Sequence, residues 1–199
     1  LQTLIDECVT LLTTLLEPVG TRQVSFRDLF HQCTGIDPLT GSMQALAHMA
    51  LEEGAEGLSR AQAVDLLMST RVESCLPEDQ LTVVTDFPGW AAALAETRTD
   101  EHGETVACRF ECYFGGQELA NGYQELTDAS EQAHRFDADR HQRRESGLPD
   151  MAADDALLAA LEHGLPACAG VAVGLERVLM ARLGADHISE VWPFPSGQA

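Results

Sequence analysis

The chain has 199 residues, of which 45% are hydrophobic and 22% charged, a composition that suits one globular domain with a substantial core. Its formal net charge is −20 and all twelve basic residues are arginine, so its surface repels nucleic-acid phosphates and argues against a tRNA- or DNA-binding face. No stretch approaches the roughly 20 apolar residues of a membrane span. The six cysteines form no CxxC pair, which argues against structural zinc and indicates reduced thiols in a cytoplasmic protein.

The first part of the chain carries helical patterns. Apolar residues recur at the i, i+3, i+4 spacing over residues 1–15, which predicts an amphipathic helix. Ser25 and Ser59 are each followed three residues later by Asp or Gln, and both motifs resemble capping boxes that begin further helices. We expect residues 1–76 to form an N-terminal helical insertion region without a chemical constellation of its own.

From residue 77 onward strands join the pattern. The predicted elements, in chain order, are a strand over 81–87, a hairpin over 107–126, a helix that begins after Asp128, a helix that ends at Gly164, a strand over 170–174, a helix that ends at Gly184 and a terminal strand over 188–194. Strands and helices mix without a βαβ alternation. The predicted class is therefore α+β, with an antiparallel sheet flanked by helices in residues 77–199.

Two glutamates of the predicted hairpin flank its turn and share one face of the sheet. A two-residue turn at Gly115-Gly116 pairs Tyr113 with Glu118, and Glu111 shares the face of Tyr113 because side chains alternate along a strand. Glu111 and Glu118 are then diagonal neighbours, about 7–8 Å apart at the backbone. Two carboxylates at this distance repel each other unless a cation lies between them, and a hard ion such as Mg²⁺ suits oxygen ligands.

A third glutamate, Glu125, follows Glu118 by seven residues. In a regular strand this odd spacing sends Glu125 to the opposite face. Asn121-Gly122 lies between them, and both residue types tolerate the left-handed conformation of a bulge, which would bring Glu125 back to the shared face. The alternative is a solvated edge strand whose glutamates point outward.

A second candidate site is the segment GVAVGLER, which places a buried strand, a glycine and an arginine at the start of a helix. Gly174 has no side chain, so a flat ring could lie against its backbone. Arg177 offers a planar fork of donors that suits a phosphate. The alternative is structural: strands that end in glycine are common, and such an arginine often pairs with an acidic neighbour.

Together, GVAVGLER, RFE…GGQELANGYQELTD and LTVVTDFP resemble the C-terminal half of a class II lysyl-tRNA synthetase catalytic domain, with GVAVGLER as its third signature motif. A closer resemblance is to the short lysyl-tRNA synthetase paralogues that join β-lysine to elongation factor P. It rests on LPACAGVAVG, on the C-terminal EVWPF and on IDPL at 36–39. It implies that residues 77–199 are the C-terminal part of a class II catalytic core.

The resemblance also implies site residues and cofactors. ATP would be bound by Glu118, Leu119, Gly174 and the catalytic Arg177, Mg²⁺ by Glu111 and Glu118, and the lysine or β-lysine substrate by Asn121, Tyr123, Glu125 and Ala172. Ala172 stands where lysyl-tRNA synthetases usually have glycine and where the ligases have alanine. One methyl group there would reshape the amino-acid pocket, which favours the ligase.

The implied reaction is a two-step acyl transfer, in which the amino acid is activated by ATP as an adenylate and then passed to a lysine of elongation factor P. Motifs 1 and 2 of class II synthetases are not in the sequence, which starts at Leu1 without a methionine. We therefore expect a C-terminal fragment of a homodimeric enzyme that is inactive on its own. The alternatives are the matching part of a lysyl-tRNA synthetase and a catalytically silent binding module.

Overall fold

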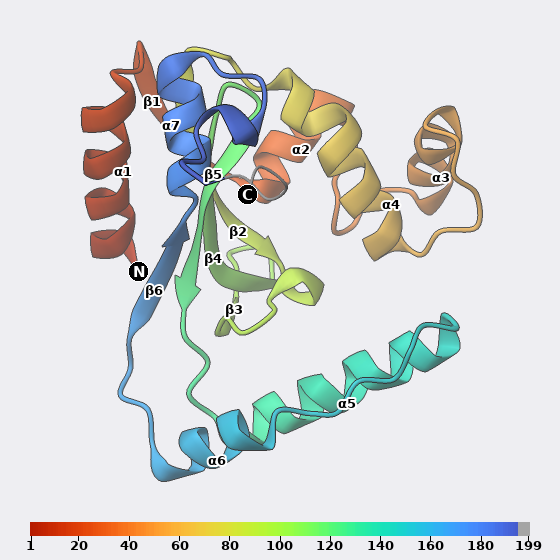
Figure 1. Cartoon of the computed structure of the whole chain (residues 1–199). Helices are drawn as coiled ribbons and strands as arrows, with labels where there is room; N and C mark the ends of the chain where they lie inside the picture. The colour runs from red at the N-terminus through yellow and green to blue at the C-terminus, as the bar shows by residue number, and fades with distance from the viewer. Residues whose placement is uncertain (195–199) are drawn as a thin grey trace.

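The computed structural model describes residues 1–194, which form one six-stranded sheet with helices on both faces (Figure 1). The strands are β1 (Gly20–Ser25), β2 (Gln80–Pro88), β3 (Thr97–Thr99), β4 (Thr105–Phe114), β5 (Gln117–Gln124) and β6 (Ala169–Val173). The helices are α1 (Gln2–Leu16), α2 (Phe26–Thr34), α3 (Met43–Glu52), α4 (Arg60–Leu67), α5 (Ala129–Glu145), α6 (Asp155–His163) and α7 (Leu175–Leu183). Four shorter turns are η1 (Met68–Val72), η2 (Glu73–Cys75), η3 (Gly89–Ala91) and η4 (Ile188–Glu190).

The sheet order is β1-β2-β4-β5-β6, and β3 pairs with β4. Every neighbouring pair is antiparallel except β1 and β2, which run parallel. The predicted α+β class is confirmed, and the sheet is mixed rather than purely antiparallel.

Alternation along the strands divides the core into two layers. Phe110 and Cys112 of β4 point to the face covered by α1 and α7, where Leu12 of α1 is fully buried against them. Tyr113 of β4 points to the opposite face, where α2 packs on β2 and buried residues of α4 join the same hydrophobic cluster. Figure 1 shows that α2, α3 and α4 lie to one side of the sheet. The face of the sheet that looks toward them carries the candidate site.

The predicted helix boundaries are largely confirmed by capping contacts. Ser25 accepts a bond from the backbone of Asp28 at the start of α2, and Ser59 forms a full capping box with Gln62 at the start of α4. Asp128 caps α5. Helices α6 and α7 end at Gly164 and Gly184 as predicted, and Gly184 takes the left-handed conformation.

Two predicted elements are wrong. The sequence predicts a helical region that includes residues 20–25, but these residues form β1, whose Gly20 pairs with Gln80. Local helix signals do not reveal a strand that depends on a distant partner. The predicted terminal strand over 188–194 is instead the 3₁₀ turn η4 followed by irregular chain.

The division into residues 1–76 and 77–199 stays a prediction. Helix α1 and strand β1 both pack on the sheet that later residues build, so the two predicted regions share one sheet and one core. Within the described 194 residues, no helix combines the length and the apolar character that a membrane crossing requires.

Candidate functional site

The hairpin of β4 and β5 closes as the sequence predicts. Gly115 and Gly116 have φ values of 59° and 71°, and a type I′ turn needs positive φ at both central residues. Tyr113 pairs with Glu118 across this turn. Glu111 and Glu118 are therefore diagonal neighbours on one face of the sheet.

The predicted bulge exists, but at Leu119 rather than at Asn121-Gly122. Cys112 pairs with Ala120 directly after the pair of Tyr113 and Glu118, so Leu119 is the extra residue of β5. Because of this extra residue, Asn121 lies opposite Glu111. Asn121, Tyr123 and Glu125 then share the face of Glu111 and Glu118.

Gly122 serves the core rather than the bulge. Its φ is not positive, and a Cβ at this position would lie 2.6 Å from the ring of Phe110 and 2.8 Å from the Gly170 carbonyl oxygen. The glycine therefore provides space for a buried ring on the back of the sheet.

Glu111 lies at the centre of a hydrogen-bonded cluster. Its Oε1 accepts bonds from Arg109 Nη2 at 2.6 Å and from Asn121 Nδ2 at 3.1 Å. Its Oε2 accepts the hydroxyl of Tyr113. With a side chain only 7% exposed, Glu111 has both oxygens engaged, which leaves roughly one of its four lone-pair sites for a ligand.

Burial sets the charge properties of this cluster. Burial raises the pKa of Glu111, while the Arg109 guanidinium and the Tyr113 hydroxyl oppose the rise and the Glu118 carboxylate adds to it. Burial and the Glu111 charge raise the pKa of Tyr113 far above its ordinary value, so Tyr113 stays a donor. Over residues 1–194, no group of three or more metal-ligating side chains converges. A metal at Glu111 and Glu118 remains a prediction.

The segment GVAVGLER lies beside the bulge, at the end of β6. Arg177 Nη1 donates to the Glu118 carbonyl oxygen at 2.6 Å and lies 3.9 Å from its carboxylate. The Gly174 amide donates to the Leu119 carbonyl at 2.9 Å. The structure thus joins the two candidate segments of the sequence at one point.

The Leu119 side chain points away from the candidate site. It is 2% exposed and belongs to the core on the α1 face. Any contact between Leu119 and a ligand is therefore left to its backbone.

Glu125 lies at the other end of the face, beside β6. It lines a cavity of about 460 Å³ together with Ala93, Arg109, Asn121, Tyr123, Gly170, Val171 and Ala172. Its carboxylate forms no hydrogen bond or ion pair with another side chain of the described chain, and burial raises its pKa. A carboxylate in such a cavity attracts a cation.

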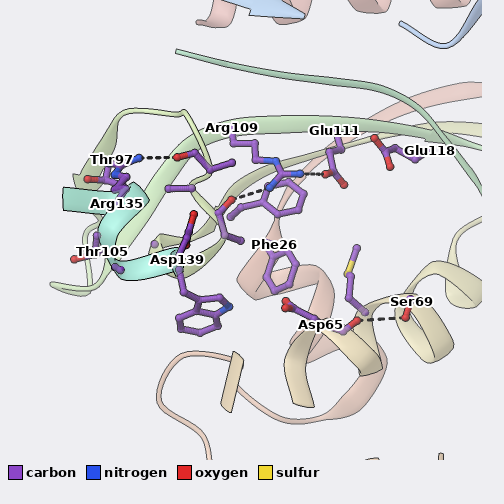
Figure 2. Close-up of a pocket in the computed structure, with 18 of the residues that line it drawn as sticks. Phe26, Asp65, Ser69, Thr97, Thr105, Arg109, Glu111, Glu118, Arg135 and Asp139 are labelled. Atoms are coloured by element: carbon purple, nitrogen blue, oxygen red, sulfur yellow. Dashed lines mark hydrogen bonds and ion pairs between the residues drawn. The ribbon is translucent and has the colours of Figure 1, made fainter. Parts of the chain in front are cut away.

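A cavity of about 840 Å³ lies between the sheet, α4 and α5 (Figure 2). Figure 2 shows Arg109 and Glu111 side by side, with Glu118 next to Glu111 and Asp65 on the opposite wall. This cavity shares Arg109 with the Glu125 cavity and shares Glu118 with a third cavity at Arg177. The three cavities therefore follow one another along a single sheet face.

Residues 10–198 match the family of tRNA synthetases class II (D, K and N). The chain belongs to this family. Three curated relatives are each named elongation factor P–(R)-β-lysine ligase. Those of Mannheimia succiniciproducens and Avibacterium paragallinarum are 44% and 42% identical over 194 residues, which cover 96% of this chain and 59% and 60% of the relatives. That of Vibrio parahaemolyticus is 41% identical over 197 residues, which cover 96% of this chain and 60% of the relative. The chain thus spans about three fifths of their length.

The candidate site also contains residues that the sequence did not single out. Arg109 and Tyr113 bind Glu111 from positions two residues before and after it, so the alternation of β4 already placed them on its face. Glu73 of η2 lines both the cavity of about 840 Å³ and the cavity at Arg177. Burial raises the pKa of Glu73, and Glu111 and Glu118 add to the rise. No local signal marked Glu73, because its closeness to the hairpin is purely tertiary.

Proposed function

We propose that this chain carries the ATP, metal and amino-acid sites of a ligase that activates lysine or β-lysine and passes it to a lysine of elongation factor P. The support is membership of the class II family and relatives that are named for the elongation factor and for (R)-β-lysine. Catalysis by such a site rests on positioning the reactants and on neutralising the charge that develops.

The observation that carries the proposal is the order of charges along one sheet face. Glu125, a carboxylate without a side-chain partner among the described residues, lines the cavity at one end. Arg177, which is half exposed, lines the cavity at the other end. An amino acid whose ammonium meets Glu125 and a nucleotide whose phosphates meet Arg177 would approach each other in the middle, at Glu111.

The residues of the site fit the two groups that the family implies, Mg²⁺ and ATP. Proteins often bind Mg²⁺ through one or two carboxylates, with substrate phosphates and water completing the shell, so Glu118 with the remaining site of Glu111 is sufficient. The atoms nearest to a Cβ on Gly174 would be those of the Arg177 side chain, at an ordinary contact distance of 3.5 Å. The fold therefore leaves space at Gly174, which suits the adenosine. When bound, ATP supplies the leaving group that activates the amino-acid carboxylate.

Different residues would bind the phosphates at one end of the site and the amino acid at the other. Arg177 would neutralise the phosphates, held in place by its bond to the Glu118 carbonyl. Glu125, the Tyr123 ring and Asn121 would bind the amine end, with Ala172 limiting the space beside them.

A cytoplasmic location and a homodimer belong to the same proposal. The six unpaired thiols support the first, and the class II resemblance alone supports the second.

The test is binding of (R)-β-lysine, L-lysine and L-glutamate to the chain by calorimetry, with ATP and Mg²⁺ present. We expect the two cationic amino acids to bind and L-glutamate not to bind. Glu125→Gln should weaken lysine binding by at least about tenfold, because a hydrogen bond to a charged group contributes about 1.5–3 kcal/mol.

Glu162→Gln, a change on exposed helix α6, is the matched control for the loss of one charge and should bind like the parent chain. Equal affinity of Glu125→Gln and the parent chain for lysine would overturn the assignment of Glu125. Binding of L-glutamate as tight as that of lysine would overturn the proposed substrate class.

A further inference from the structure

We propose that Arg109 is a positioning residue of this site: it holds the Glu111 carboxylate and the Asn121 amide in one orientation and so couples the metal half to the amino-acid half. The expected coupling of the two halves of the site rests on the proposed function. The orientation of Glu111 and Asn121 rests only on the contacts of Arg109.

Arg109 makes three directed hydrogen bonds from one planar group. Nη2 donates to Glu111 Oε1 at 2.6 Å, Nε donates to Asn121 Oδ1 at 3.2 Å, and Nη1 donates to the Ala91 carbonyl at 2.7 Å. The guanidinium also lies over the Phe87 ring, 4.8 Å from its centroid. With three of its roughly five N–H groups bound, the side chain is held in one place.

These contacts dictate which way the Asn121 amide points. Arg109 has only donors and an ionised Glu111 has only acceptors, so the amide oxygen must face Arg109 and the amide nitrogen must face Glu111. The Asn121 Nδ2 bond to Glu111 Oε1, at 3.1 Å, closes the triangle. A flipped amide would set a donor against the guanidinium and an acceptor against the carboxylate.

The position of Arg109 gives this triangle its consequence. Arg109 lines both the large cavity that contains Glu111 and the smaller cavity that contains Asn121 and Glu125. One guanidinium therefore sets the geometry of groups in both cavities. Lysine cannot replace it, because an ammonium lacks the planar fork that reaches Glu111 and Asn121 at fixed angles.

A purely structural role is the competing explanation, since Arg109 also binds the Ala91 carbonyl and stacks on Phe87. The two roles differ in one respect. A structural residue affects ligand binding whether or not Asn121 keeps its amide, whereas a positioning residue acts through that amide.

The first experiment observes the Asn121 side-chain amide by NMR in the parent chain and in Arg109→Lys. The matched control is Arg98→Lys, which alters an ion pair with Asp86 on the surface. We expect slowed hydrogen exchange of the Asn121 NH₂ group in the parent chain and in the control, and faster exchange in Arg109→Lys. Unchanged exchange in Arg109→Lys would overturn the inference.

The second experiment is a double-mutant cycle on lysine affinity with Arg109→Lys, Asn121→Ala and the pair. We expect Arg109→Lys alone to weaken binding by about tenfold, and by less than about twofold when Asn121 is already alanine, because contacting residues are not additive. Effects that multiply independently would assign Arg109 a structural role. If the parent chain binds no amino acid, the proposed function fails, while the amide measurement still decides the role of Arg109.

Discussion

The two faces of the β4–β5 hairpin are stabilised by different interactions, apolar packing on one and directed hydrogen bonds on the other. On the α1 face, Phe110, Cys112 and Leu119 fill a closed apolar core in which shape decides what fits. On the opposite face, Arg109 and Glu111 belong to a polar cluster beside a cavity, in which each donor needs a specific acceptor. One strand therefore carries a volume constraint and a hydrogen-bonding constraint on alternate residues.

The largest effect is expected on the apolar face of the hairpin, at Gly122. Gly122→Ala should lower the free energy of unfolding by about 3 kcal/mol, the upper end for overpacking, because the new Cβ meets both a buried ring and the β6 backbone. Urea unfolding monitored by circular dichroism measures the change.

Gly20→Ala is the matched control, because its Cβ would meet only the flexible end of Gln80 at 3.4 Å. The double variant Gly122→Ala, Phe110→Leu tests the same cause, because it removes the ring that the new Cβ would meet. If Gly122→Ala proves as stable as Gly20→Ala, the back face is not limited by volume at this point.

A smaller effect is expected on the polar face. Tyr113→Phe removes the donor to Glu111 Oε2 and should cost about 1 kcal/mol, the lower end for an unsatisfied buried acceptor, because water can enter from the adjoining cavity. Urea midpoints measure the cost, and Tyr123→Phe is the control, since it removes a hydroxyl on the same face four strand pairs away from Tyr113. A Tyr113→Phe chain more stable than the parent would contradict the bond's importance.

The smallest effect is a pH dependence at Glu125. Burial raises its pKa in the folded chain, so the folded state holds this proton more tightly than the unfolded state does. The contribution of Glu125 therefore favours folding below its unfolded pKa of about 4.3 and declines as pH rises through the raised value. We expect the stability of the parent chain to fall relative to Glu125→Gln over that range, measured by urea unfolding at a series of pH values. A difference that stays constant with pH, after correction with Glu162→Gln, would contradict this.

The sequence predicted what depends on neighbouring residues. Gly115-Gly116 determined the turn, the turn determined the pairing of Tyr113 with Glu118, and odd spacing required one bulge before Glu125. The position of the bulge was not predictable, because Asn121-Gly122 offered the stronger local signal while the need for space beside Phe110 is tertiary.

Pairings between residues far apart in the chain were less predictable. Strand β1 exists through its contact with β2, and Glu73 reaches the site through the packing of η2. The predicted roles of the site residues stay predictions, although the structure gathers the candidate segments on one face.

The separations of paired strands along the sequence also indicate an order of folding. Phe114 and Gln117 are three positions apart, whereas Gly20 and Gln80 are 60 positions apart and Gln124 and Ala169 are 45 positions apart. Since closing a longer loop costs more entropy, we expect the β4–β5 hairpin to form early and the two outer strands to join later. The glutamates of the hairpin would then be aligned while the chain is still largely unfolded, and the walls brought by β6 and η2 would enclose them last.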